Sequence, residues 1–148
     1  MTEIISAKDY MQRVKKKTAR VDREGPIHLQ CLHWLQWQFP DAVIHHSANE
    51  LNMAGTPTAR KIAQGKAKKM GMLPGFPDLI MFWRCHAWAF EIKAPEGRLT
   101  KEQKDVGARL VANGFRWDAA YSLADVQALV AVWRKDVVMR APMRGQVT

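Results

Sequence analysis

The chain has 148 residues, 47% of them hydrophobic, which is enough for one domain with a buried core. No apolar run approaches the ~20 residues that span a bilayer, and no leader-like segment opens the chain, so we expect a cytoplasmic protein without a membrane partner. The two cysteines, Cys31 and Cys85, form no CxxC pair, which argues against a zinc site and favours reduced thiols.

The formal net charge of +9 is concentrated in two segments. Residues 1–20 carry six basic and two acidic groups, and residues 51–77 carry five basic groups and no acid. Such segments indicate a polyanion partner, above all nucleic acid, although solvated surface charge is the alternative. We interpret 1–20 as a basic arm, 21–139 as the domain that contains the 51–77 insertion, and 140–148 as a tail.

After the arm, apolar residues at helical intervals predict a helix from about Asp22 to Phe39, with Pro26 tolerated in its first turn. Residues 42–47 alternate as a short strand does, which turns His45 and His46 to opposite faces. Each histidine is either an ordinary strand residue or a substrate contact.

The basic insertion predicts a helix from Thr58 to Met70 between segments that contain Gly and Pro. We expect its basic side chains, and the lysines of the arm, to contact nucleic-acid phosphates, which supply affinity without sequence information. These candidate contacts are Arg60, Lys61, Lys66, Lys68, Lys69, Lys15, Lys16 and Lys17.

Two apolar runs, 79–83 and 87–92, flank Arg84-Cys85-His86 and predict a tight hairpin of buried strands. The next helix has Thr100 as its N-cap, with Gln103 at its third position, and closes at 113–114. Its expected core stripe consists of Val106, Leu110 and Val111.

The last two elements are a strand from Phe115 to Tyr121 and a helix capped by Ser122. The apolar stripe of this helix consists of Val126, Leu129, Val130 and Trp133. The order helix, three strands, helix, strand, helix predicts an α/β (α+β) domain, in which helices flank a central mixed sheet of about four strands.

The hairpin brings three charged residues together. If its turn is centred between Arg84 and Cys85, counting back along both strands places Asp78 opposite Glu91. Opposed residues in an antiparallel pair have Cβ atoms about 4.5–5.5 Å apart, where two carboxylates repel each other unless a cation intervenes. Lys93 projects from the same face as Glu91, because side chains in a strand alternate.

Two carboxylates, a backbone carbonyl and water form an all-oxygen site that suits Mg²⁺, with Mn²⁺ as a substitute, better than zinc. Such an ion activates water and polarises a phosphodiester, and Lys93 could orient or deprotonate that water. The alternative is that Asp78 is a turn residue after Pro77, while Glu91 and Lys93 form a surface salt bridge.

Three segments resemble the VRR-NUC branch of the PD-(D/E)xK nuclease superfamily, and the resemblance covers about residues 22–125. They are Gly75-Phe76-Pro77-Asp78-Leu79-Ile80, Phe90-Glu91-Ile92-Lys93 and Leu99-Thr100-x-x-Gln103. The resemblance implies a restriction-endonuclease-like core. It also implies that Asp78, Glu91 and the Ile92 carbonyl are metal ligands and that Lys93 lies at the attacking water.

Two further residues have a structural alternative. The resemblance implies that Glu24 is an additional acidic group at the site, but Glu24 is also a charge favoured at a helix start. The resemblance implies that Gln103 reaches the attacking water or a phosphate, whereas Thr100-x-x-Gln103 is also a capping box, which needs no catalytic role. The two interpretations of Gln103 are compatible.

The sequence thus predicts a metal-dependent endonuclease that hydrolyses DNA phosphodiester bonds. The resemblance adds a preference for branched or junction DNA and a role in phage or bacterial repair. Because a double-strand or junction cut needs two cutting centres, we expect a homodimer, with a monomeric nickase as the alternative. The competing functions are a nucleic-acid-binding module without cleavage and a structural subunit for an acidic protein.

Overall fold

The computed structural model describes residues 21–47 and 55–139, so the basic arm, part of the insertion and the tail lie outside the described residues. The elements are α2 (Glu24–Gln38), β1 (Val43–His46), α3 (Pro57–Lys69), β2 (Leu79–Trp83), β3 (His86–Ile92), α4 (Lys101–Ala112), β4 (Arg116–Ala120) and α5 (Leu123–Met139). Each is a predicted element with its ends shifted by at most two residues. No helix within the described ranges is long and apolar enough to cross a membrane.

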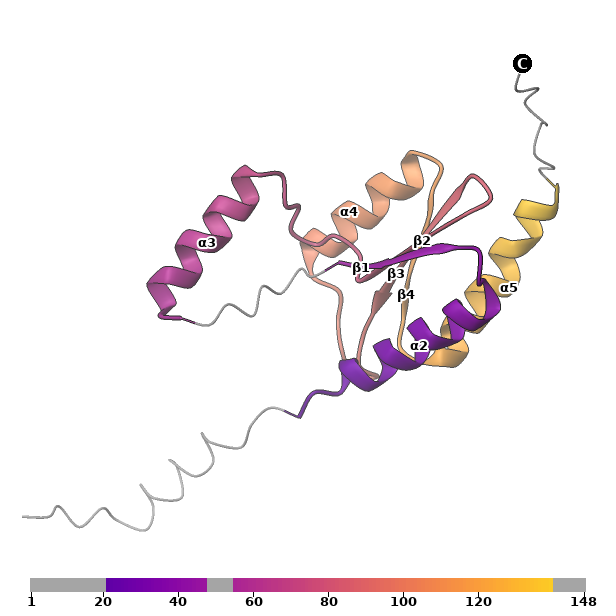
Figure 1. Cartoon of the computed structure of the whole chain (residues 1–148), viewed down its shortest axis with the longest axis horizontal. Helices are drawn as coiled ribbons and strands as arrows, with labels where there is room; N and C mark the ends of the chain where they lie inside the picture. The colour runs from indigo at the N-terminus through magenta and orange to yellow at the C-terminus, as the bar shows by residue number, and fades with distance from the viewer. Residues whose placement is uncertain (1–20, 48–54, 140–148) are drawn as a thin grey trace, which may run out of the picture.

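The strands form one mixed sheet in the order β1-β2-β3-β4, which confirms the predicted α/β architecture. Strand β2 pairs antiparallel with both β1 and β3, whereas β3 and β4 are parallel and are joined through α4. Figure 1 shows α2 and α5 together on one side of the sheet and α4 on the other. Helix α3 stands away from the sheet (Figure 1).

The main core lies between the sheet and the pair α2 and α5. Cys31 and Leu35 of α2 are fully buried against Trp88 and Phe90 of β3 and Trp133 of α5. The Trp133 ring lies 5.9 Å from Trp88 and 5.1 Å from Phe90, measured between ring centroids. Full burial of one such apolar side chain contributes about 1.5–3 kcal/mol, so this layer holds the sheet rigid.

The opposite face of the sheet is covered only in part. Val106 of α4 is buried there, and the indole of Trp117 lies so close to Gly107 that an added Cβ would be 2.4 Å away. The prediction that Val111 belongs to the core is wrong: the residue is 53% exposed, because it lies about 100° around the helix from the buried stripe. Phe82 of β2, expected to be buried, is 50% exposed, because no helix or strand among the described residues covers it.

The hairpin has the predicted register. Leu79 pairs with Phe90 at one end and Trp83 with His86 at the other, so the turn is centred between Arg84 and Cys85. Both turn residues have positive φ, 47° and 64°, as a two-residue type I′ turn requires. This turn sets the register that brings Asp78, before β2, and Glu91, near the end of β3, to one end of the sheet.

Candidate active site

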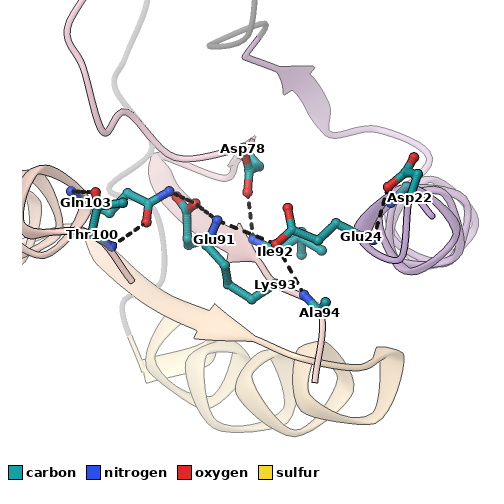
Figure 2. Close-up of polar contacts among 10 residues, drawn as sticks. Asp22, Glu24, Asp78, Glu91, Ile92, Lys93, Ala94, Thr100 and Gln103 are labelled. Carbon is teal, nitrogen blue, oxygen red and sulfur yellow. Dashed lines mark hydrogen bonds and ion pairs between the residues drawn. The ribbon is translucent and has the colours of Figure 1, made fainter. Parts of the chain in front are cut away.

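An open cleft of about 420 Å³ lies at the end of the sheet where β2 begins and β1 and β3 end. The cleft is lined by six residues that the sequence singled out, contributed by α2, β1, the loop before β2, the end of β3 and α4. They are Glu24, His46, Asp78, Ile92, Lys93 and Gln103. Figure 2 shows the side chains of Glu24, Asp78 and Gln103 around the last residues of β3, near Glu91 and Lys93.

Asp78 is held at the start of β2 by the backbone of two neighbouring segments. Its carboxylate Oδ2 accepts a hydrogen bond from the Ile92 N–H at 2.8 Å, and its carbonyl accepts one from the Ser47 N–H at 2.9 Å. Because Leu79 pairs with Phe90, Asp78 occupies the next position along the ladder, beside Glu91. The carboxylate is therefore fixed against the end of β3.

Glu91 is a fully buried carboxylate. Its Oε1 accepts a hydrogen bond from Gln103 Nε2 and lies 3.0 Å from Lys93 Nζ, whereas the buried Oε2 has no hydrogen-bond partner. Burial and the nearby charge of Asp78 raise the pKa of Glu91 to about 7, against the opposing effect of Lys93. Lys93 therefore does not fully offset the effect of burial and of the Asp78 charge, so binding of a proton or of a further cation is favoured at Glu91.

Lys93 places its ammonium group between two carboxylates. Nζ lies 3.0 Å from Glu91 Oε1 and 3.9 Å from Glu24 Oε1, and the side chain is only 12% exposed. Burial lowers the pKa of Lys93, but the hydrogen bond and charge of Glu91, aided by Glu24, outweigh it and raise the pKa overall. Lys93 is thus a cation in this arrangement, which favours orienting water over deprotonating it.

Glu24 is the first residue of α2, where Asp22 begins the helix by accepting hydrogen bonds from the N–H groups of Glu24 and Gly25 at 3.2 and 2.9 Å. Glu24 Oε1 in turn accepts a hydrogen bond of 3.4 Å from the Ala94 N–H. These contacts tie the start of α2 to the end of β3, so Glu24 holds Lys93 in place (Figure 2).

Gln103 completes the predicted capping box and also contacts the site. Its Oε1 accepts from the Thr100 N–H at 2.8 Å while the Gln103 N–H donates to Thr100 Oγ1 at 3.2 Å, which completes the predicted capping box. The remaining amide group, Nε2, donates to Glu91. The start of α4 is therefore joined to the buried carboxylate through a single side chain.

Sequence reasoning missed three residues that also line the cleft, namely His28, Ser47 and Asp22. His28 follows Glu24 by one helical turn, a spacing that could have identified it. Its ring lies 4.5 Å from that of His46, and His46 Nδ1 is 3.1 Å from the Asp78 carbonyl. Burial and His46 lower the pKa of His28, against the effect of Asp78.

The donor set fits a hard divalent cation. Asp78, Glu91 and the Ile92 carbonyl are all oxygen donors, and the unpartnered Oε2 of buried Glu91 marks an unmet demand for a positive partner. Among the described residues, no three His, Cys, Asp or Glu side chains gather closely enough to hold a metal ion by themselves. A metal held here would therefore need the backbone carbonyl and water as well as the two carboxylates.

The basic candidates lie elsewhere. Arg60, Lys61, Lys66, Lys68 and Lys69 are exposed on α3, which has no buried residue and does not line the cleft. The helix begins with Thr56 as N-cap, whose hydroxyl accepts a 3.3 Å hydrogen bond from the Ala59 N–H. The other predicted contacts, Lys15, Lys16 and Lys17, lie outside the described residues.

No model of a protein family matches the sequence, and no curated protein matches it significantly. Among solved structures, the chain is similar to a VRR_NUC domain protein, with 22% sequence identity and a TM-score of 0.55. The likeness covers 79% of this chain and 92% of that one. At this level of identity it shows the fold, so the resemblance seen in the sequence motifs is matched by the architecture.

Proposed function

Starting from a VRR-NUC fold, we propose that this protein is a metal-dependent endonuclease that hydrolyses DNA phosphodiester bonds. The observation that carries the proposal is the buried Glu91 carboxylate, which lies directly beneath an open cleft, next to Asp78 and Lys93 of the cleft lining. Burying a carboxylate with one oxygen that has no hydrogen-bond partner lowers the stability of the fold. Its presence here therefore favours a functional role over a structural one. Two carboxylates and a cation at a cleft suit phosphodiester hydrolysis.

In this proposal Asp78, Glu91 and the Ile92 carbonyl would hold Mg²⁺, with Mn²⁺ as a substitute. When bound, the ion supplies polarisation of the scissile phosphate and activation of the attacking water. The resemblance also offers Glu24 as a metal ligand, but its carboxylate contacts the Ala94 N–H and, at 3.9 Å, Lys93 Nζ, so we assign it to positioning Lys93.

The protein's own groups set the geometry for this chemistry. The Lys93 ammonium stabilises negative charge that develops on the phosphate and orients water, and its low exposure strengthens both effects. Gln103 donates to Glu91 Oε1 and so fixes the rotamer of the carboxylate. The backbone N–H of Ile92 does the same for Asp78.

Substrate choice is assigned to the surface outside the cleft. We propose that the basic side chains of α3 and of the arm contact DNA phosphates, which explains the net charge of +9. We further propose branched DNA as the preferred substrate and a homodimer as the form that makes paired cuts. A chain with one cleft needs a second copy to cut both strands at once.

The test is cleavage of end-labelled duplex, flap and four-way-junction DNA in Mg²⁺, Mn²⁺ or EDTA. We expect Asp78→Asn, Glu91→Gln and Lys93→Met each to reduce cutting at least ~10³-fold, because each removes charge from the reacting centre. Thr56→Ala is the matched control, because it weakens the cap of α3, outside the cleft, and leaves every charge in place.

Folding of each variant is checked by circular dichroism and thermal melting, so a loss of cutting is not mistaken for a loss of structure. Equal cutting by the three folded variants, or undiminished cutting in EDTA, would contradict the assignment. Binding without cutting in any metal would leave the competing function, a nucleic-acid-binding module.

A further inference from the structure

A second open pocket, also about 420 Å³ in volume, surrounds the turn of the β2–β3 hairpin. Its lining includes Asp41, Phe82, Arg84, Ala87 and Phe115. The turn lies at the opposite end of the two strands from the candidate active site (Figure 1). None of the roles assigned above uses these side chains. We call this site the hairpin pocket.

Two phenylalanines stand on either side of a small residue in this pocket. Phe82 pairs directly with Ala87, and the pairing of Trp88 with Arg116 places Phe115, one residue earlier, beside Ala87. Neighbouring strands are about 4.8 Å apart, so the two phenylalanines are roughly 9.6 Å apart at the backbone. Two rings that sandwich a flat ring at contact distance need only ~7 Å, so the spacing suits one planar aromatic group.

Both rings are accessible. Phe82 is 50% exposed and Phe115 is 44% exposed, in a chain that buries most of its other aromatic rings near the sheet. The half-exposed rings together present about 200 Å² of apolar surface, which is well below the ~800 Å² per partner that a stable dimer buries. The pocket is therefore too small for a second copy and suits a small flat ligand.

Polar side chains at the rim of the hairpin pocket indicate the chemistry of the flat ligand. Arg84 at the turn is exposed, with its guanidinium 4.6 Å from the Trp83 ring centroid, and can pair with a phosphate. Asp41 Oδ1 accepts from Trp83 Nε1 at 3.1 Å, which leaves its second oxygen to accept from an amine. An aromatic base with amino groups and an attached phosphate matches the two rings, Arg84 and Asp41 of the pocket, and its negative charge suits a chain of charge +9.

We propose that the hairpin pocket binds one unpaired nucleobase of a DNA strand, stacked between Phe82 and Phe115 with its phosphate at Arg84. DNA as the ligand rests on the proposed function. Phe82 lies four residues along β2 from Asp78, about 13 Å at ~3.3 Å per residue. That length is about four nucleotide steps, so a base displaced from its duplex near a branch reaches the pocket while the backbone lies at the cleft.

The experiment measures binding rather than cutting. The full chain, in EDTA, is titrated into duplex DNA that carries one unpaired 2-aminopurine as a flap nucleotide, and into the same duplex without the flap. We expect stacking to quench the 2-aminopurine fluorescence. Phe82→Ala and Phe115→Ala should each weaken flap binding about tenfold, whereas Phe82→Tyr, which keeps a stacking ring, should not.

Trp37→Ala is the matched control, since this indole on α2 is 77% exposed and lies outside the hairpin pocket. It should leave flap binding unchanged, and none of the variants should affect plain-duplex binding by more than about twofold. Equal losses on both DNAs, or an unquenched probe, would overturn the proposal. Sedimentation that shows a dimer dissociated by Phe82→Ala would also overturn it, by identifying an interface between copies.

The result is independent of whether the protein cuts DNA. Quenching that depends on Phe82 would support the hairpin pocket even if the Asp78, Glu91 and Lys93 variants left cleavage unchanged. Conversely, metal-dependent cutting with no quenching would leave the nuclease assignment intact and refute the pocket.

Discussion

The candidate active site and helix α3 use charge in opposite ways. In the site, Glu91 is fully buried and Lys93 nearly so; Lys93 pairs with Glu91, and Glu91 also accepts a hydrogen bond from Gln103 of α4. In α3 no residue is buried, and the five basic groups face solvent. Buried charges interact strongly in one geometry, whereas solvated charges attract over a distance and are screened by salt. The molecule therefore separates precise positioning from general attraction.

Two glycines with positive φ make the same contrast in the backbone. Gly75 has a φ of +79°, and a Cβ added there would lie 2.4–2.6 Å from backbone atoms of Glu102 and Gln103. Gly71, at the end of α3, has a φ of +100° and open space around it. The loop before Asp78 is thus fitted against the start of α4, while the chain at the end of α3 is not confined.

The largest effect should come from substituting these glycines. We expect Gly75→Ala to lower the free energy of unfolding by about 2–4 kcal/mol, from the backbone clash and the strained φ together, and to reduce cleavage. Gly71→Ala should cost only about 1–2 kcal/mol and leave cleavage unchanged. Chemical denaturation and initial cleavage rates measure both effects. Equal losses in the two variants would remove the distinction between the regions.

An effect of intermediate size should appear in the pH dependence of stability. Burial and Asp78 raise the pKa of Glu91 from 4.5 to about 7, so between these pH values the folded state binds more protons than the unfolded state. The free energy of unfolding of the metal-free protein should therefore fall as pH rises from 4.5 to 7, by up to about 3 kcal/mol. Glu91→Gln should remove this fall and leave the rise in stability with pH that the lowered pKa of His28 contributes.

Thermal melts of both proteins in EDTA at half-unit pH intervals make the measurement. Neutralising Lys66, Lys68 and Lys69 serves as the control, because these exposed groups of α3 should leave the pH slope unchanged. A fall that persists in Glu91→Gln would mean that another group carries it. Mg²⁺ should raise the melting temperature more at pH 8 than at pH 5, because protons compete for the same carboxylate.

The smallest effect on stability should come from α3 itself. Replacing Lys66, Lys68 and Lys69 with Gln should change the free energy of unfolding by no more than about 0.5 kcal/mol. DNA binding should nevertheless weaken, and the slope of log K against log salt should become shallower by about 2.7 if each lysine meets a phosphate. The slope is measured by fluorescence-anisotropy titrations. An unchanged slope would mean that these lysines of α3 do not contact DNA phosphates.

Local patterns predicted most of the fold and the centre of the site. The hairpin turn set the register, and alternation then put Glu91 and Lys93 on one face. The capping box of Thr100 and Gln103 placed the start of α4 correctly. These features depend on residues that are close in sequence, and their geometry follows from turn type and strand periodicity.

Features that depend on packing between distant segments were not predictable from one sequence. His28 of α2 and Ser47, directly after β1, line the same cleft only because the two segments meet in the folded chain, where the His28 ring contacts that of His46. The exposure of Phe82 depends on how far α4 extends over the sheet, which its own periodicity does not reveal. Val111 was misplaced for the same reason, because an apolar residue beside a buried stripe is ambiguous until the facing surface is known.

The hairpin turn has a practical consequence for labelling. Cys85 is exposed at the turn, whereas Cys31 is buried in the core, and burial raises the pKa of its thiol to about 11. Because the thiolate is the reacting species, a maleimide reagent near neutral pH should modify Cys85 and spare Cys31. The unaltered chain thus carries a native attachment point for one fluorophore, so conformational changes at this end of the sheet can be followed without engineering a cysteine.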